Sequence, residues 1–311
     1  MMKENNSRTI LVCLTLIFVL IVIKTQAQQT PAFSEYNYNP FILNAAYAGL
    51  TENTEISIAN SGHFNSFEGS PKSFSFSGHG QLNRGKMGVG AGIIRDEIGV
   101  TTSTSAFAAY SYKIFFDFEN HRPNWQIYSP GVISFGITAG IQQFQDNLLE
   151  LGIVDDPKFA ENINATIPTI GLGFLFNHAS FYAGVSAPNV LGDALATDDN
   201  LHLENPVYGY FGYRFFNNRF ENLTIKPNVL IKHENGAPLQ VDMNIAVSFR
   251  NKFEVGAGYR TSSSVNLLAG IYLLNNLRFI YNYNVAMNNS PLGNTHGFIL
   301  SCQFGKGYSI D

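Results

Sequence analysis

Between Gln240 and Arg260, apolar and polar residues alternate with a period of two. Successive side chains of a β-strand point to opposite faces of a sheet, so this alternation predicts strands with one apolar and one polar face. The pattern breaks at Asn251 and then restarts, which indicates two neighbouring strands that divide their faces in the same way. The apolar set of the first strand is Val241, Met243, Ile245, Val247 and Phe249.

The composition favours lipid as the environment of the apolar face. Only 14% of the residues are charged, against roughly 25% in soluble domains, and 14% are aromatic. The mean hydropathy is −0.01, an average that a barrel reaches when lipid-facing and lumen-facing residues alternate along each strand. We therefore predict an all-β fold, a transmembrane antiparallel β-barrel of the outer-membrane type. A soluble two-sheet sandwich is the alternative.

Residues 1–27 have the pattern of a secretory signal peptide. Lys3 and Arg8 precede an apolar run from Ile10 to Ile23, and Ala27 completes a small-x-small cleavage pattern. The run is about 14 residues long, shorter than the roughly 20 that a transmembrane helix needs. A retained signal anchor is the alternative. The mature chain, residues 28–311, has Cys302 as its single cysteine, which excludes an intramolecular disulfide.

After residue 53 we count fourteen segments rich in Gly, aromatic and β-branched residues, bounded by clusters of Asn, Gly, Asp or Pro. Their length matches tilted strands that cross a bilayer, which need roughly 9 to 11 residues. Long connections, among them Gln145 to Ala165, Pro188 to Asn205 and Asp96 to Thr101, mostly alternate with tight ones. Outer-membrane barrels show this alternation, with short periplasmic turns and longer outer loops. We expect about 14 strands and both termini at the periplasmic end.

The parity of the pattern also predicts one register. In the segment from Thr224 to His233 the even positions carry most of the polar residues, and the same holds from Gln240 onward. Residues that face each other across two strands lie on the same side of the sheet. We therefore predict an odd-length loop that places Lys232 opposite Gln240 and Leu230 opposite Asp242.

Charged residues of three neighbouring segments fall on the polar face, which lines the lumen of a barrel. There, opposite charges can pair with each other and water can enter. The predicted lumen-lining charges are Lys226, Lys232, Asp242, Arg250, Glu254 and Arg260.

The sequence offers no catalytic, cofactor-binding or metal-binding constellation. Gly80 to Lys86 has the spacing of a phosphate-binding loop, but Met87 stands where that loop needs Ser or Thr, and no helical pattern follows. The glycines from Gly88 to Gly92 lie inside a predicted strand, where they allow a close backbone approach or a bend. The seven histidines are scattered, and a formal net charge of −4 gives no reason to expect nucleic acid binding.

The start of the mature chain, Pro31 to Gly49, resembles the opening motif of the PorP/SprF family of outer-membrane proteins of the Bacteroidetes type IX secretion and gliding systems. The resemblance continues through Phe67 to Pro71, Lys226 to Lys232 and Gly258 to Thr261, and covers essentially the whole mature chain. The chain departs from the family pattern at Ala45, where Pro is usual, and at Thr295 to Gly297, where a Ser-His-Glu-like triplet is common.

The resemblance implies a non-enzymatic barrel that supports export or surface anchoring of a secreted, adhesin-like protein through its C-terminal sorting domain, together with other type IX components. We expect residues 28–53 to lie against or inside the periplasmic mouth. The alternative function is an outer-membrane channel or transporter for small solutes. Apolar residues in the two longest outer loops are candidates for binding the partner: Leu148, Leu149, Leu151, Val190, Leu191 and Leu195.

Overall fold

The structure is a computed structural model and describes residues 34–62, 69–116, 131–153, 156, 159–191, 205–216, 223–235, 237–261, 264–287 and 293–308. The predicted signal peptide lies outside these residues. The short 3-10 helices are η1 (Ser34–Asn37), η2 (Pro40–Ile42), η3 (Ala45–Tyr47) and η4 (Leu148–Leu151). The strands are β1 (Glu55–Ser61), β2 (Lys72–Leu82), β3 (Met87–Ile98), β4 (Thr101–Phe116), β5 (Gly131–Asp146), β6 (Ile163–Asn177), β7 (Phe181–Ala187), β8 (Val207–Tyr213), β9 (Phe215–Phe216), β10 (Leu223–His233), β11 (Gln240–Phe249), β12 (Phe253–Arg260), β13 (Ser264–Leu273), β14 (Leu277–Ala286) and β15 (Thr295–Gln303).

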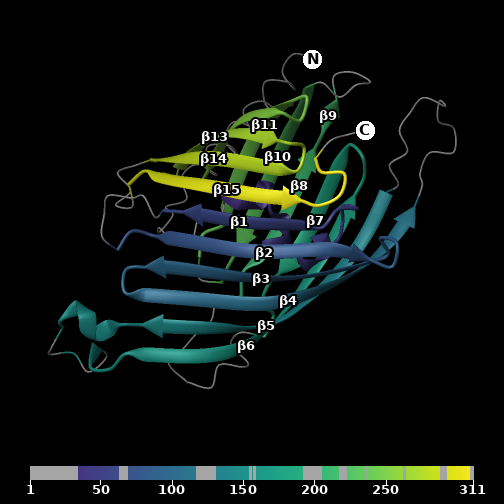
Figure 1. Cartoon of the computed structure of the whole chain (residues 1–311). Coiled ribbons are helices and arrows are strands. Elements are labelled where there is room, and N and C mark those ends of the chain that lie inside the picture. Colours follow the sequence, from purple (N-terminus) through teal and green to yellow (C-terminus); the bar gives the residue numbers. More distant parts are fainter. Residues whose placement is uncertain are drawn as a thin grey trace, which may run out of the picture.

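The strands form one antiparallel sheet that closes on itself (Figure 1). Strand β1 pairs with β2 on one side and with β15 on the other, so the first strand meets the last. Strands β8 and β9 lie end to end along β10, interrupted only at Arg214, and together occupy one position of the wall. The fifteen segments therefore build a 14-stranded barrel, and the predicted fold is confirmed.

The two faces of the wall differ as the alternation predicts. On β11, Met243, Ile245 and Phe249 are exposed on the outside, whereas Asp242 and Ser248 are buried inside. Large apolar side chains are exposed on the outside of strands around the barrel, as expected for a surface that meets lipid. The predicted register is also confirmed, because Lys232 pairs with Gln240 and Leu230 with Asp242.

The connections define two ends of the barrel. At one end, which we call the turn end, β2–β3, β11–β12 and β13–β14 are joined by tight turns whose two central residues all have positive φ. These are Asn83 and Arg84, Arg250 and Asn251, and Leu274 and Asn275. Two consecutive left-handed residues match the right-handed twist of the flanking strands. The start of β1 and the end of β15 lie at this end, and most longer connections lie at the other, the loop end.

One predicted connection is shorter than expected. Residues 96–101 were expected to form a loop, but β3 continues to Ile98 and β4 begins at Thr101, so only two residues join the strands. Asp96 pairs with Ser103 and Ile98 with Thr101 in the ladder. The reason is that β3 and β4, with 12 and 16 residues, continue beyond the roughly 9 to 11 residues that cross a bilayer.

Candidate functional site in the barrel interior

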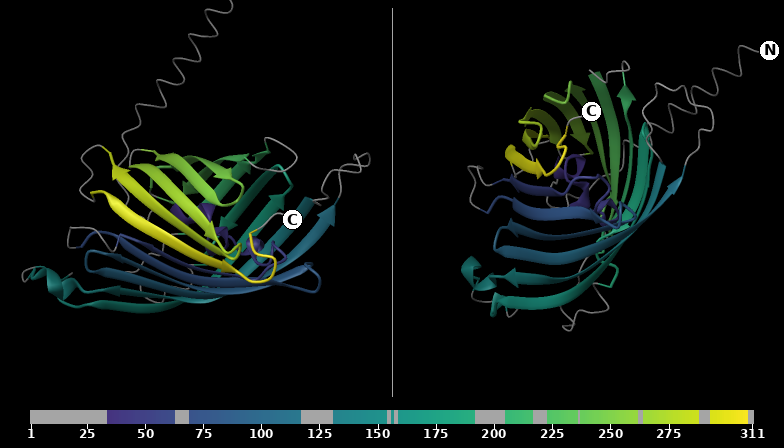
Figure 2. Two further views of the ribbon diagram at one scale, coloured as in Figure 1. Left: turned by 45° about the horizontal axis from the view of Figure 1, so that its top comes forward. Right: turned by 45° about the vertical axis from the view of Figure 1, so that its right-hand side comes forward.

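The N-terminal segment from Tyr36 to Leu50, which we call the plug, lies inside the barrel. Figure 2 shows its purple helices between the two sides of the wall. Phe41, Ala46 and Ala48 are almost completely buried. Helix η3 contacts β4, β5 and β6, while η2 contacts β2. The plug is therefore packed as a core against the inner face of the wall.

The local sequence of the plug favours compact turns over a strand. Pro40 occupies the first turn of η2, where its missing N–H costs no hydrogen bond. Asn44 caps η3, with its side-chain oxygen accepting a hydrogen bond from the Ala46 amide at 2.8 Å. Gly49 has φ +58°, a left-handed conformation that suits glycine as the chain turns towards β1.

Small residues of the wall make room for the plug. Gly88, Ser111, Gly136 and Gly173 face one another across β3 to β6 and form a row on the inner surface. A Cβ atom on Gly136 would overlap the backbone of the plug at Ala45 and Ala46, and one on Gly88 would overlap the Ala48 carbonyl. These strand glycines therefore allow close backbone approach, one of the two roles expected for Gly88.

Wall side chains hydrogen-bond to the plug backbone along the same row. Ser111 Oγ and Lys113 Nζ donate to the Ala48 carbonyl at 2.7 and 2.5 Å, respectively. Ser134 Oγ donates to the Ala46 carbonyl at 2.7 Å. Buried carbonyls without partners are costly, so these donors satisfy the carbonyls at the end of η3.

Polar side chains of β2, β11 and β12 also hold the plug. The Tyr38 hydroxyl donates to Glu254 Oε1 at 2.9 Å, and Asn39 Nδ2 donates to Ser77 Oγ at 2.8 Å. The Tyr36 hydroxyl accepts a hydrogen bond from Asn244. Burial, together with the neighbouring Glu254 carboxylate, raises the pKa of Tyr38 well above its ordinary value. Tyr38 thus remains a neutral hydrogen-bond donor at physiological pH.

Five of the six predicted lumen charges point into the interior and pair. Lys226 bridges Glu254 at 2.9 Å, and Arg260 makes two hydrogen bonds to Asp242 at 2.8 and 2.5 Å. Lys232 bridges Glu234 at the loop end, at 2.6 Å. Each of these five charges is therefore paired with a charge of the opposite sign.

The prediction for Arg250 is wrong. Arg250 is exposed in the turn between β11 and β12, with φ +51° and its guanidinium over the Phe249 ring. The strand ends one residue earlier than the alternation suggests, because Arg250 and Asn251 together form the two-residue turn.

A buried ion pair that the sequence did not reveal lies where the barrel closes. Arg278 on β14 pairs with Glu55 on β1 at 2.7 Å and also donates to the Tyr38 carbonyl of the plug at 2.6 Å. Tyr308, beyond the last strand, donates to Glu55 at 3.2 Å, and its ring lies beside the Arg278 guanidinium. The first strand, the segment after the last strand and the plug therefore meet at one charge pair.

We predict that Arg278→Met strongly destabilises the barrel. The pair is about nine-tenths buried, with side-chain exposures of 11% and 10%, and removing one partner of a buried pair costs roughly 3–5 kcal/mol. The matched control is Arg95→Met, because Arg95 pairs with Glu97 at 54% and 34% exposure, where a pair contributes about 0–1 kcal/mol. Urea unfolding of both variants in lipid vesicles measures the difference. Equal midpoints would contradict the assignment.

The candidate partner-binding residues lie at the loop end. Leu149 and Leu151 of η4 are 58% and 47% exposed, and Leu148 is partly buried. Val190 and Leu191, after β7, are also exposed. Leu195 lies outside the described residues. The structure brings Leu149 and Leu151 together in one helical turn, with Ile153 exposed next to them.

Two small cavities lie next to the plug. One, of about 180 Å³, lies between the plug, β4 to β6 and Pro188, and another, of about 200 Å³, lies between the plug, Tyr182, Tyr210 and Arg214. Within the described residues, no group of three or more His, Cys, Asp or Glu side chains is placed to hold a metal ion. Among the same residues, no helix is long and apolar enough to cross a bilayer.

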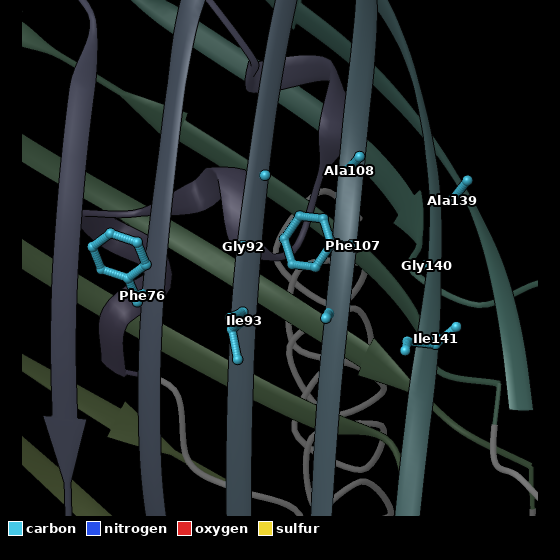
Figure 3. A pocket seen from close by; sticks show the side chains of 10 residues that line it. Phe76, Gly92, Ile93, Phe107, Ala108, Ala139, Gly140 and Ile141 are labelled. Carbon is cyan, nitrogen blue, oxygen red and sulfur yellow. The ribbon is translucent and has the colours of Figure 1, made fainter. Parts of the chain in front are cut away.

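A larger groove, of about 510 Å³, runs along the outer surface of β2 to β5. Figure 3 shows Phe76, Ile93 and Ile141 along it and the Phe107 ring between Gly92 and Gly140. Its lining is apolar, which fits a wall that faces lipid.

Several known proteins are similar to this chain. A family model described as "Type IX secretion system membrane protein PorP/SprF" matches residues 25–302. Similar solved structures include the Acinetobacter baumannii outer membrane protein Omp33, with 10% identity, a TM-score of 0.45, and coverage of 82% of this chain and 100% of that chain. The CymD monoaromatic hydrocarbon channel has 9% identity, a TM-score of 0.48, and coverage of 88% and 93%. A search of curated proteins finds no match.

Proposed function

We propose that this chain, which belongs to the PorP/SprF family of type IX secretion system membrane proteins, supports the export or surface anchoring of a cognate secreted protein. The family places the barrel in the outer membrane, and membership implies association with other secretion components. In this orientation the turn end is periplasmic and the loop end faces outward. Residues 1–27 would direct the chain to the secretory pathway.

The position of the plug inside the barrel is the observation that carries this proposal. A diffusion channel needs a continuous water-filled lumen, whereas here the plug occupies the interior and binds the wall with buried side chains on several strands. Each of the ion pairs around it joins one positive and one negative charge, so these pairs carry no net charge that would attract a solute. The arrangement favours a binding scaffold over the alternative of a solute channel.

The loop end provides the surface for the partner. Leu149, Leu151 and Ile153, which we call the outer apolar patch, are exposed next to β5 and β6. Exposed apolar patches on an otherwise polar rim mark protein interaction sites. We infer that the patch contacts the C-terminal sorting domain of the secreted protein, and that the barrel itself catalyses no reaction.

The double substitution Leu149→Asp/Leu151→Asp tests this proposal. We expect the surface protein to be released from the cells into the medium, because the patch loses its apolar contacts while the wall is unchanged. Leu274→Asp is the matched control, since Leu274 is 85% exposed in a turn at the opposite end. Immunodetection of the surface protein in cell and medium fractions gives the result. Full retention by the double variant would reject the proposal.

A further inference from the structure

The backbone of β6 is unpaired along part of one edge. Strand β5 pairs with all of β6, from Ile163 to Asn177. Strand β7 pairs only from Leu172 to Asn177, and one further bond joins the Val190 amide to the Ile170 carbonyl. In Figure 1, β6 is the last strand of the stack that begins with β1. Residues 163–169 therefore have a strand neighbour on the β5 side only, among the described residues.

The direction of the unpaired groups follows from the bond at Ile170. In an antiparallel ladder the N–H and C=O of one residue point to the same side, and the side alternates along the strand. Because the Ile170 carbonyl points away from β5, the backbone groups of Asn164, Thr166 and Pro168 point the same way. Pro168 has no N–H, and proline is tolerated where the N–H side of a strand is free. The open edge, which we call the β6 edge, thus offers the amides of Asn164 and Thr166 and three carbonyls.

The β6 edge stands above the lipid. The outward residues of β6 change from apolar, at Leu172 and Ile170, to polar, at Thr166 and Asn164, all of them exposed. Unpaired backbone groups are not tolerated in hydrocarbon, so this change places the edge in water on the outer side. The outer apolar patch is directly attached, because the Leu149 amide donates to Asn162 Oδ1 at 3.0 Å.

The β6 edge is poorly protected against strand pairing. Natural proteins guard free edges with charged side chains, especially Lys, or with proline. Strand β6 contains no Asp, Glu, Lys or Arg, and Pro168 removes only one donor. An edge of this kind recognises an extended peptide, whose backbone supplies the missing donors and acceptors while its side chains meet the neighbouring apolar residues.

A second copy of the chain fits this edge poorly. Two copies in one membrane have the same orientation, so their β6 strands run in the same direction. If the same edges of two parallel, symmetry-related strands meet, donors lie level with donors and the ladder cannot form. A contact between the β6 strands of two copies is therefore excluded, which favours a strand of a different protein as the occupant.

From this we propose that the β6 edge receives a β-strand of the secreted partner, which extends the barrel sheet beside the outer apolar patch. This inference rests on the proposed function and names the contact through which the partner is held. The partner segment is an extended strand that supplies backbone carbonyls to the amides of Asn164 and Thr166.

Thr166→Pro removes one of these amides and tests the proposal directly. Pro168 already occupies an equivalent position of the same strand, so the wall can form. We expect retention of the surface protein on washed cells to fall at least tenfold. Thr166→Val keeps the amide and the branched side chain, and should retain the protein as the unchanged chain does. A heat-dependent shift of the barrel in gel electrophoresis checks that both variants fold.

Amide hydrogen exchange supplies a second measurement. The probe is the purified C-terminal domain of the surface protein that Leu149→Asp/Leu151→Asp releases. Its addition to the purified barrel should slow amide exchange at residues 164 and 166. The amides of residues 165 and 167, which face β5, should exchange slowly both with and without the added domain.

The outcomes separate the two proposals. If Thr166→Pro retains the surface protein while Leu149→Asp/Leu151→Asp releases it, the strand contact is wrong and the proposed function stands. Slow exchange at residues 164 and 166 in the barrel alone would show that its own chain covers the edge, and would overturn the inference. Release by neither variant would overturn both.

Discussion

Gly136→Leu is expected to convert the closed barrel into a conducting pore. The unchanged chain should give no steady current in a planar bilayer, because the plug fills the interior. A side chain at Gly136 would overlap the backbone of Ala45 and Ala46, which cannot move aside as a flexible side chain could. Overpacking costs roughly 1–3 kcal/mol where neighbours relax. Here the Cβ atom alone would already overlap the Ala46 nitrogen, so the cost of a whole leucine side chain is larger, and displacement of the plug relieves it.

The wall should survive this change. Gly136 lies on β5, which pairs along most of its length with both β4 and β6, and its side-chain position faces inward. Once the plug has left, polar side chains such as Ser111, Asn228 and Glu254 line a wetted lumen. We expect discrete current steps and rapid protease cleavage of residues 36–50.

Gly209→Leu is the matched control for the pore experiment. A Cβ atom on Gly209 meets no heavy atom within 4 Å, so the same substitution adds volume without touching the plug. This variant should give no steady current in the bilayer. If Gly136→Leu is also silent and its N-terminal segment resists protease, the plug does not close the barrel in the way that the contacts indicate.

The pairing of neighbouring strands could be predicted from the sequence because it depends on local pattern. Side chains alternate strictly along a strand, so the parity of polar positions was enough to place Lys232 opposite Gln240. The same reasoning failed at Arg250, because alternation alone does not mark where a strand ends. The turn there has no glycine, and only Asn251 is a residue that commonly adopts positive φ.

The interior contacts could not be predicted in this way, because they join residues that are far apart in the chain. Tyr38 and Glu254 are 216 positions apart, and Glu55 meets Arg278 only once β1 has closed on β15. One signal was present: β5 and β6 carry glycines in their interior, among them Gly136 and Gly173, and glycine within a strand often marks a close backbone approach. Such glycines indicate that something packs against the wall, but the identity of that segment follows only from the closed fold.

A lysine on the outer face should impair membrane assembly far more than one on the inner face of the same strand. Ile245 lies near the middle of β11 and is 49% exposed on the side that meets lipid. Lysine at the bilayer midplane costs a barrel about 2–4 kcal/mol, equivalent to roughly a 30- to 1,000-fold shift of the folding equilibrium. We expect Ile245→Lys to lower the yield of folded barrel in vesicles and to shift its urea midpoint accordingly.

Asn244→Lys introduces the same charge one residue earlier, on the inside. It removes the hydrogen bonds from Asn244 to Tyr36 and Asn228, a loss of about 1 kcal/mol per bond. The long side chain can extend into the cavity beside the plug, which Asn228 lines. Both variants introduce a lysine into the same strand. The difference between their urea midpoints therefore reports the environment of each face. Equal destabilisation would mean that the outer face of β11 does not meet lipid.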